Sequence, residues 1–213
     1  HKVTTVGLLD EVLPAAVIAG ACNAVRRLPD GRLQGDMFDG EGFVRGVVRK
    51  GFQPKGARAL VVGCGGVGSA IAASLAAAGV AQLSLHDVSA ASSDGLAARL
   101  TRHYPALAVR TGYNDPSGHA LVVNATPMGM NEGDPLPMDM DRIDPSAMVG
   151  EVVMRSDITA FLAAARSRGC TIQITRRIIL SRRRRTWRRA ARGDRAAGAA
   201  GLSGRARLKV GAQ

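Results

Sequence analysis

A glycine-rich segment at residues 63–68 contains the residue types and spacing that most directly indicate chemistry. Gly63, Gly65 and Gly68 have the G-x-G-x-x-G spacing, after an apolar run typical of a strand and before a helical pattern. In such a loop the glycines allow a tight turn, close approach of the backbone to a pyrophosphate and close packing of helix on strand. The residues that we expect to bind a dinucleotide here are Gly63, Gly65, Gly66, Val67 and Gly68.

An acidic residue, Asp87, ends the next apolar run, 19 residues after Gly68. A carboxylate at this place accepts hydrogen bonds from the adenine-side ribose hydroxyls and repels the 2′-phosphate of NADP. The next arginine is Arg99, so no neighbouring cation offsets that repulsion. The sequence therefore favours NAD as the cofactor, with NADP as the second choice. The alternative is a glycine-rich turn followed by an incidental aspartate.

The elements that must position this loop alternate along the chain from Ala57 onward. Short β-type runs and helical stretches follow one another, a pattern typical of an α/β fold with a doubly wound (Rossmann) parallel sheet. The expected strands are Ala59–Val62, Gln82–Asp87, Ala108–Thr111, Leu121–Asn124, Val149–Val153 and Thr171–Ile174. The expected helices are Val67–Ala78, Ala91–His103 and Ile158–Arg168.

Charge and composition restrict the class of protein. The chain has 213 residues, 46% of them apolar, and a net charge of +12. Residues 1–175 contain 16 basic and 16 acidic side chains, so the whole excess of positive charge lies in residues 176–213.

The longest apolar run is far below the roughly 18 residues that a membrane-spanning helix needs. The three cysteines are isolated and lack metal-ligand spacing, which predicts a cytoplasmic protein without a metal.

With these features in place, the chain resembles the shikimate dehydrogenase family over about residues 1–173. The segments that carry the resemblance are His1-Lys2, Gly20-Ala21-Cys22-Asn23-Ala24, Gly35 through Asp39-Gly40 to Gly42-Phe43, the Gly63 loop, and Asn124-Ala125-Thr126-Pro127-Met128-Gly129-Met130. The resemblance implies an NAD(P)-dependent oxidoreductase that interconverts shikimate and 3-dehydroshikimate, or a close analogue such as quinate, in aromatic amino acid biosynthesis or quinate use. It also allows for a homodimer.

The resemblance assigns roles to individual residues. Lys2 and Asp39 match the family's catalytic lysine and aspartate, and both would also contact the substrate, together with Asn23. A lysine beside a carboxylate can exchange the hydroxyl proton that leaves or returns during hydride transfer. The residues of the later motif that would contact the cofactor are Asn124, Ala125, Thr126 and Met128.

Two departures from the family pattern concern the substrate. Met37 and Phe38 stand where the family has Asn-Thr, and Glu151 and Met154 replace an aspartate and a tyrosine in the segment Val149–Met154. These changes predict a more apolar pocket, which would also admit a quinate-like or otherwise modified cyclohexene carboxylate.

Three regions are expected. Residues 1–38 look like the remnant of a smaller α/β substrate domain whose beginning is absent, residues 39–175 form the Rossmann domain, and residues 176–213 are an Arg-rich tail with 13 basic side chains. The tail has three interpretations: a nucleic-acid-binding arm, a disordered extension, or out-of-frame translation of a GC-rich gene. The abrupt change of composition favours the last, so nucleic acid is not the expected partner. The other functional alternative is an inactive, cofactor-binding remnant of the family.

Overall fold

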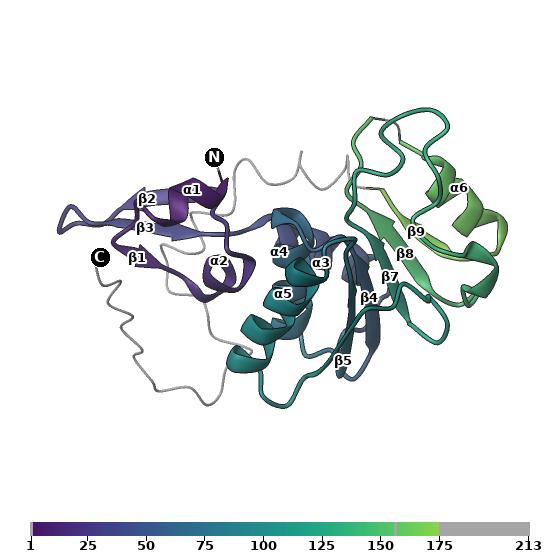
Figure 1. Ribbon diagram of the computed structural model, residues 1–213, viewed down its shortest axis with the longest axis horizontal. Helices are drawn as coiled ribbons and strands as arrows, with labels where there is room; N and C mark the ends of the chain where they lie inside the picture. Colours follow the sequence, from purple (N-terminus) through teal and green to yellow (C-terminus); the bar gives the residue numbers. More distant parts are fainter. Residues whose placement is uncertain (1, 156, 175–213) are drawn as a thin grey trace.

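Two separate sheets organise the chain in the computed structural model, which describes residues 2–155 and 157–174 (Figure 1). The smaller sheet has the strand order β1-β3-β2, in which β1 is parallel and β2 antiparallel to β3. Its elements are α1 (Lys2–Val6), β1 (Glu11–Val12), α2 (Pro14–Ala19), β2 (Ala24–Arg27) and β3 (Leu33–Asp36). The β2 and β3 strands form a hairpin closed by Gly31, whose φ is +88°.

The larger sheet has six parallel strands in the order β6-β5-β4-β7-β8-β9. Its strands are β4 (Arg58–Val62), β5 (Gln82–His86), β6 (Ala108–Thr111), β7 (Leu121–Asn124), β8 (Met148–Glu151) and β9 (Thr171–Gln173). The chain runs outward from β4 to β6 and then returns to place β7 beside β4. This reversal is the topological switch point of a doubly wound fold, so the predicted fold class is confirmed.

Helices cover the two faces of the larger sheet unequally. The helices α3 (Asp39–Arg49), α4 (Gly66–Ala77) and α5 (Ala90–His103) share one apolar core with the residues of β4 that point to their side, Ala59 and Val61. The alternate residues Leu60 and Val62 join a second core with the 3-10 helix η1 (Met140–Arg142) and α6 (Ala160–Ser167). Because side chains alternate along a strand, β4 is buried on both faces and lies centrally.

The smaller and larger sheets are joined through α3 and α4. At Gly40 a Cβ atom would lie 1.9 Å from the carbonyl oxygen of Ala70 in α4, and 2.5 Å from the hydroxyl of Ser74. Only a glycine allows the two helix backbones to approach this closely. The first turn of α3 is thereby fixed against the helix that follows the glycine loop.

From residue 57 onward the expected elements agree with the observed ones within two residues at every boundary. For residues 2–51 the sequence predicted no helices or strands. The structure has α1, α2, α3 and the three-stranded sheet in this region. The division at residue 39 remains a prediction. Residues 176–213 lie outside the described part of the chain, and the interpretations of the tail stay predictions.

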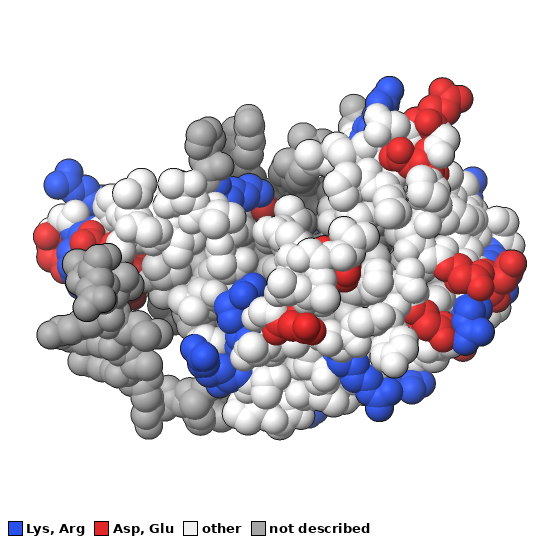
Figure 2. Space-filling model, viewed as in Figure 1, with Lys and Arg blue, Asp and Glu red and all other residues white. Residues whose placement is uncertain are grey.

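Charged side chains of both signs intermingle on the face seen in Figure 2, where much of the central surface is uncharged. This pattern agrees with the equal number of acidic and basic residues over residues 1–175. None of the helices in residues 2–155 and 157–174 is long and apolar enough to cross a membrane.

Replacing Gly40 by alanine tests the close packing of α3 on α4. The added methyl group would collide with the Ala70 carbonyl, and we expect a loss of roughly 1–3 kcal/mol in the free energy of unfolding, measured by urea denaturation. Helix propensity alone would instead stabilise the variant by up to about 1 kcal/mol. Gly7→Ala is the control, because a Cβ there meets only the Thr4 carbonyl oxygen, at 3.8 Å. Equal stability of the two variants would contradict the packing argument.

Candidate active site

The glycine loop connects β4 to α4 at the switch point of the sheet. Gly63 has φ +97°, and a Cβ there would lie 2.6 Å from the carbonyl carbon of Ala125. At Gly68 a Cβ would lie 1.8 Å from the Gly63 carbonyl oxygen. Both glycines are therefore required for the turn and for packing the helix on the loop.

The middle of the loop is open where a ligand would approach. Gly65 precedes the first turn of α4, and a Cβ at this position would meet no atom within 4 Å. Gly66 lies against Ala21, and Val67 packs on the apolar core. A bare backbone at the N-terminus of a 12-residue helix, with free space in front of it, fits the pyrophosphate of a dinucleotide.

Asp87 is held against the glycine loop by backbone hydrogen bonds. Its Oδ2 accepts from the amide of Cys64 at 2.7 Å, and its Oδ1 accepts from the amide of Ser89 at 2.9 Å. Burial, and next the charge of Asp87, raise the pKa of the Cys64 thiol to about 12. The thiol therefore stays protonated, and the negative charge at this end of the loop belongs to Asp87.

The three residues expected at the substrate side are brought together by the structure. Lys2 Nζ donates to Asp39 Oδ2 at 2.8 Å. The Lys2 carbonyl accepts from the amide of Cys22 at 2.9 Å, beside Asn23. Asn23 Oδ1 in turn accepts from the amide of Phe38, which directly precedes Asp39, at 3.0 Å. One hydrogen-bonded network thus links positions far apart in sequence.

Asp39 and Lys2 form an ion pair that solvent can reach. Asp39 lies in the first turn of α3, where the positive end of the helix dipole stabilises an anion. Its side chain is 25% exposed and that of Lys2 is 49% exposed, so the pair is open to a ligand. A lysine held beside a carboxylate can give a proton to an alkoxide as the ammonium and take one from an alcohol as the neutral amine.

The loop after β7 is organised by its own side chains. Asn124 Oδ1 accepts from the amide of Thr126 at 3.0 Å and from its hydroxyl at 2.6 Å, while Asn124 Nδ2 donates to the carbonyl of Met128 at 3.0 Å. The Thr126 hydroxyl also accepts from the Met128 amide at 3.1 Å. Because Asn124 is fully buried, its side chain shapes the loop, whereas Ala125, Thr126 and Met128 are partly exposed and remain candidates for contact with a cofactor.

Glu151 is a buried residue of this region whose role sequence reasoning missed. It ends β8, beside Asn124, and is 1% exposed. Its carboxyl oxygens lie 2.8 and 2.9 Å from the Thr159 hydroxyl, which caps α6 by accepting from the Leu162 amide. Burial raises the pKa of Glu151, and hydrogen bonds from Thr159 and Asn124 partly oppose this effect. The carboxyl group therefore ties the loop after β7 to the start of α6.

The expectation of a more apolar pocket needs a correction at Met37. This side chain is 2% exposed and packs with Ala16, Ala19, Ala21 and Ala70. It fills the space between the small sheet and α4 and does not line an open site. Phe38 is half-buried beside Asp39, and Met154 is 57% exposed, so these two positions remain candidates for contact with a substrate.

Comparisons with known proteins agree with this geometry. The ThiF family model matches residues 53–97. The chain is 37% identical over 173 residues to the shikimate dehydrogenase (NADP(+)) of Rubrobacter xylanophilus, covering 79% of this chain and 61% of that protein. It is 31% identical over 174 residues to the enzyme of the same name from Paracoccus denitrificans, covering 81% and 62%. The chain thus spans less than two thirds of the length of these relatives.

Solved structures show the same likeness. Shikimate 5-dehydrogenase from Listeria monocytogenes, in complex with shikimate and NAD, has a TM-score of 0.77 at 25% identity, covering 84% of this chain and 66% of that one. Quinate dehydrogenase from Corynebacterium glutamicum, in complex with NAD, has a TM-score of 0.73 at 31% identity, covering 84% and 65%.

Substituting Glu151 by glutamine tests the buried carboxyl. A carboxyl group whose pKa is raised on folding stabilises the protein fully below its unfolded pKa, about 4.5, and loses that contribution as the pH rises through the folded pKa. We expect the unfolding free energy of the parent to fall relative to that of Glu151→Gln above pH 4.5, by up to about 1.4 kcal/mol for each unit of pKa displacement. Urea denaturation from pH 4 to 8 measures this. Parallel pH profiles would contradict the assignment.

Proposed function

We propose that this chain, which belongs to the shikimate dehydrogenase-like family, catalyses hydride transfer between NAD and shikimate or a close analogue such as quinate. The observation that carries the proposal is the hydrogen bond between Lys2 and Asp39, at 2.8 Å, in a network that reaches the glycine loop. Cys22 and Asn23 are part of this network, and Ala21, which directly precedes Cys22, lies against Gly66 at the start of α4. This contact supports the proposal that the proton-transfer pair and the dinucleotide loop belong to one site.

The chain's own residues would manage the proton and the substrate hydroxyls. Lys2 gives a proton to the carbonyl oxygen during reduction and takes it back during oxidation, while Asp39 orients the ammonium group and accepts from a neighbouring substrate hydroxyl. Asn23 Oδ1 accepts a hydrogen bond from the Phe38 backbone amide. The side-chain nitrogen of Asn23 can therefore donate to a second substrate hydroxyl. When bound, the nicotinamide supplies the hydride acceptor or donor.

The cofactor proposed is NAD, although the curated relatives are named for NADP(+). Asp87 puts a negative charge at the position expected for the adenine-side ribose. Arg99 is the nearest following arginine, and its Nε donates to the carbonyl of Ile18 in α2 at 2.7 Å. Arg99 holds α2 on α5 through this bond, and its positive charge also acts on the Cys64 thiol of the glycine loop, which the sequence did not predict. The structures of the Listeria and Corynebacterium proteins contain NAD.

We further propose a substrate class, a cellular location and an oligomeric state. The expected partner is a small hydroxylated carboxylic acid, as the family resemblance implies. A cytoplasmic location is supported by Cys22, Cys64 and Cys170, which are all free thiols. A homodimer rests on the family resemblance alone.

Replacing Lys2 by alanine tests the catalytic pair. Without the Lys2 amine the substrate hydroxyl loses the base that takes its proton, and we expect kcat for shikimate or quinate oxidation to fall by roughly two to four orders of magnitude. The dissociation constant for NADH, measured by fluorescence titration, should change less than about threefold because Lys2 is not part of the glycine loop. Lys55→Ala, an exposed lysine before β4, is the control and should keep parent activity. Normal turnover in Lys2→Ala would contradict the assignment.

Calorimetric titration of NADH and NADPH tests the cofactor. We expect NADH to bind the parent at least about tenfold more tightly, a difference of about 1.4 kcal/mol, and Asp87→Ala to reduce this ratio by removing the repulsion of the 2′-phosphate. Asp94→Ala, in the middle of α5, is the control and should keep the parent ratio. Tighter binding of NADPH to the parent would show that the preference assigned to Asp87 is wrong.

A further inference from the structure

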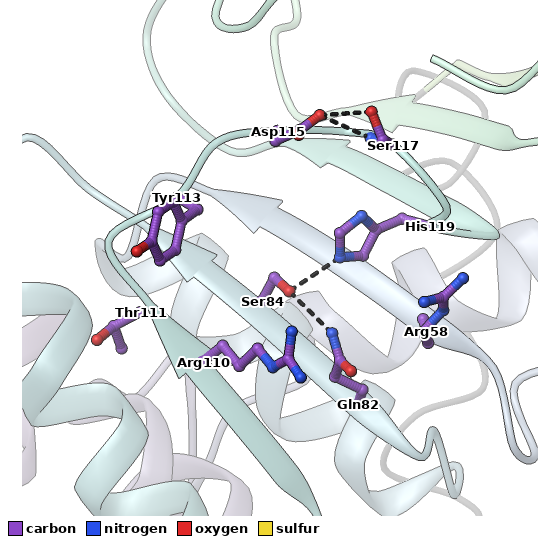
Figure 3. Close-up of a pocket in the computed structure, with 9 residues that line it drawn as sticks. All are labelled: Arg58, Gln82, Ser84, Arg110, Thr111, Tyr113, Asp115, Ser117 and His119. Carbon is purple, nitrogen blue, oxygen red and sulfur yellow. Dashed lines mark hydrogen bonds between the residues drawn. The ribbon is translucent and has the colours of Figure 1, made fainter. Parts of the chain in front are cut away.

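A polar pocket lies on the face of the large sheet that α3, α4 and α5 do not cover (Figure 3). On this face α6 packs on β8 and β9, while the segment 112–120, which connects β6 to β7 without a helix, passes over β5. The pocket has a volume of about 420 Å³, within the range of roughly 300–1,000 Å³ that is usual for small-molecule sites. Its lining side chains come from β4, β5, β6 and the segment 112–120.

The strand register explains why these side chains meet. Arg58 of β4 is paired with Gln82 of β5, and Ser84 of β5 is paired with Arg110 of β6. Because side chains alternate along a strand, all four point to the same face, with Gln82 and Ser84 between the two arginines. Figure 3 shows this arrangement, with His119 above Ser84.

The floor of the pocket is ordered by hydrogen bonds. Ser84 is 7% exposed, and its hydroxyl lies 2.8 Å from His119 Nε2 and accepts from Gln82 Nε2 at 3.3 Å. Burial lowers the pKa of His119 and the positive charge of Arg58 adds to this effect, while backbone groups of Pro116 and Ser117 and the charge of Asp115 oppose it.

The charge of the pocket comes from Arg58 and Arg110. In the described part of the chain neither guanidinium takes part in an ion pair or a side-chain hydrogen bond. Arg58 lies close to the loop, since a Cβ at Gly118 would be 2.8 Å from its Nη2 atom. Two unneutralised guanidinium groups on either side of neutral hydrogen-bonding side chains form a site complementary to an anion.

The one acidic lining residue does not cancel this charge. Asp115 accepts two hydrogen bonds from Arg142, from Nε at 2.9 Å and from Nη2 at 2.7 Å. It also accepts from the hydroxyl and the amide of Ser117, at 2.7 and 3.0 Å. These bonds hold the pKa of Asp115 well below its usual range, and Arg142 balances its charge.

We propose that this pocket binds the phosphate group of a small molecule. Guanidinium groups form paired hydrogen bonds with phosphate oxygens, and Gln82 Nε2, which uses one N–H on Ser84, has a second N–H that can donate to a remaining phosphate oxygen. The site is separate from the glycine loop: Arg58 lies four residues before Val62, about 13 Å along β4. The pocket volume exceeds the size of a bare phosphate ion, and Tyr113, 75% exposed, offers a ring for the rest of the ligand.

A site-resolved titration tests the proposal with the full 213-residue chain. Inorganic phosphate, glycerol 3-phosphate and, for comparison, succinate are added while amide nitrogen–proton NMR spectra are recorded. We expect both phosphates to shift the amide signals of Ser84, Thr111, Gly118 and His119, with saturation, and succinate to bind at least about tenfold more weakly. Tighter binding of the ester than of inorganic phosphate would identify a phosphorylated small molecule as the ligand, whereas equal binding would identify the phosphate group alone.

Variants separate the pocket from other cationic groups. Arg58→Ala and Arg110→Ala should each raise the dissociation constant for phosphate at the pocket signals at least about tenfold, since each removes one guanidinium. Arg102→Ala, an exposed residue near the end of α5, should change it less than twofold. The arginines of residues 176–213 are present in every variant and do not affect the comparison.

Three results would overturn the proposal: no saturable shift at the pocket signals, equal dissociation constants in the parent and both pocket variants, or the same weakening in Arg102→Ala. Signals remote from the pocket show in the same spectra whether each variant is folded. A second readout is the NMR titration of the His119 ring, whose pKa should rise when phosphate binds and when Arg58 is removed. This inference does not depend on the proposed dehydrogenase activity.

Discussion

The contact between Gly40 and Ala70 is the constraint on which the proposed site depends. The absence of a side chain at Gly40 brings the first turn of α3 onto α4, so Asp39 at the start of α3 is fixed relative to the helix that follows the glycine loop. Lys2 is then held by Asp39 and by the amide of Cys22. A backbone approach between two helices thereby determines where a proton-transfer pair stands relative to a dinucleotide loop.

On the other side of the switch point, close packing at glycines also fixes the position of the loop after β7. Gly63 and Gly68 pack against Ala125, so the glycine loop and the loop after β7 touch directly. Asn124 and Glu151, both buried, shape the second loop and connect it to α6 through Thr159. Buried polar groups are costly unless they are hydrogen-bonded, and here each bond orders a segment that borders the crevice.

Much of the larger sheet is predictable from the sequence because its central strands β4 and β7 are largely apolar on both faces and its helices begin at recognisable positions. Ser89 and Thr159 cap α5 and α6, and the glycine spacing marks the start of α4. The first 51 residues are different: β1 has two residues and α1 has five, and such short elements form only through tertiary contacts. The burial of Met37 likewise depends on packing between α2 and α4, which no local pattern indicates. Arg58, Arg110 and His119 are scattered along the chain, and only the strand register brings them into one pocket.

The central claim is that one substrate hydroxyl is reached from both sides, by Lys2 and by the nicotinamide. A crystal structure of the chain with NAD and shikimate tests this most directly. The account predicts the pyrophosphate at Gly65, the carboxylate of Asp87 on the adenine-side ribose, and the reacting hydroxyl within hydrogen-bond distance of Lys2 Nζ with its carbon facing the nicotinamide ring. A ring directed away from the Lys2–Asp39 pair, or a shikimate molecule bound without contact to Lys2, would contradict it.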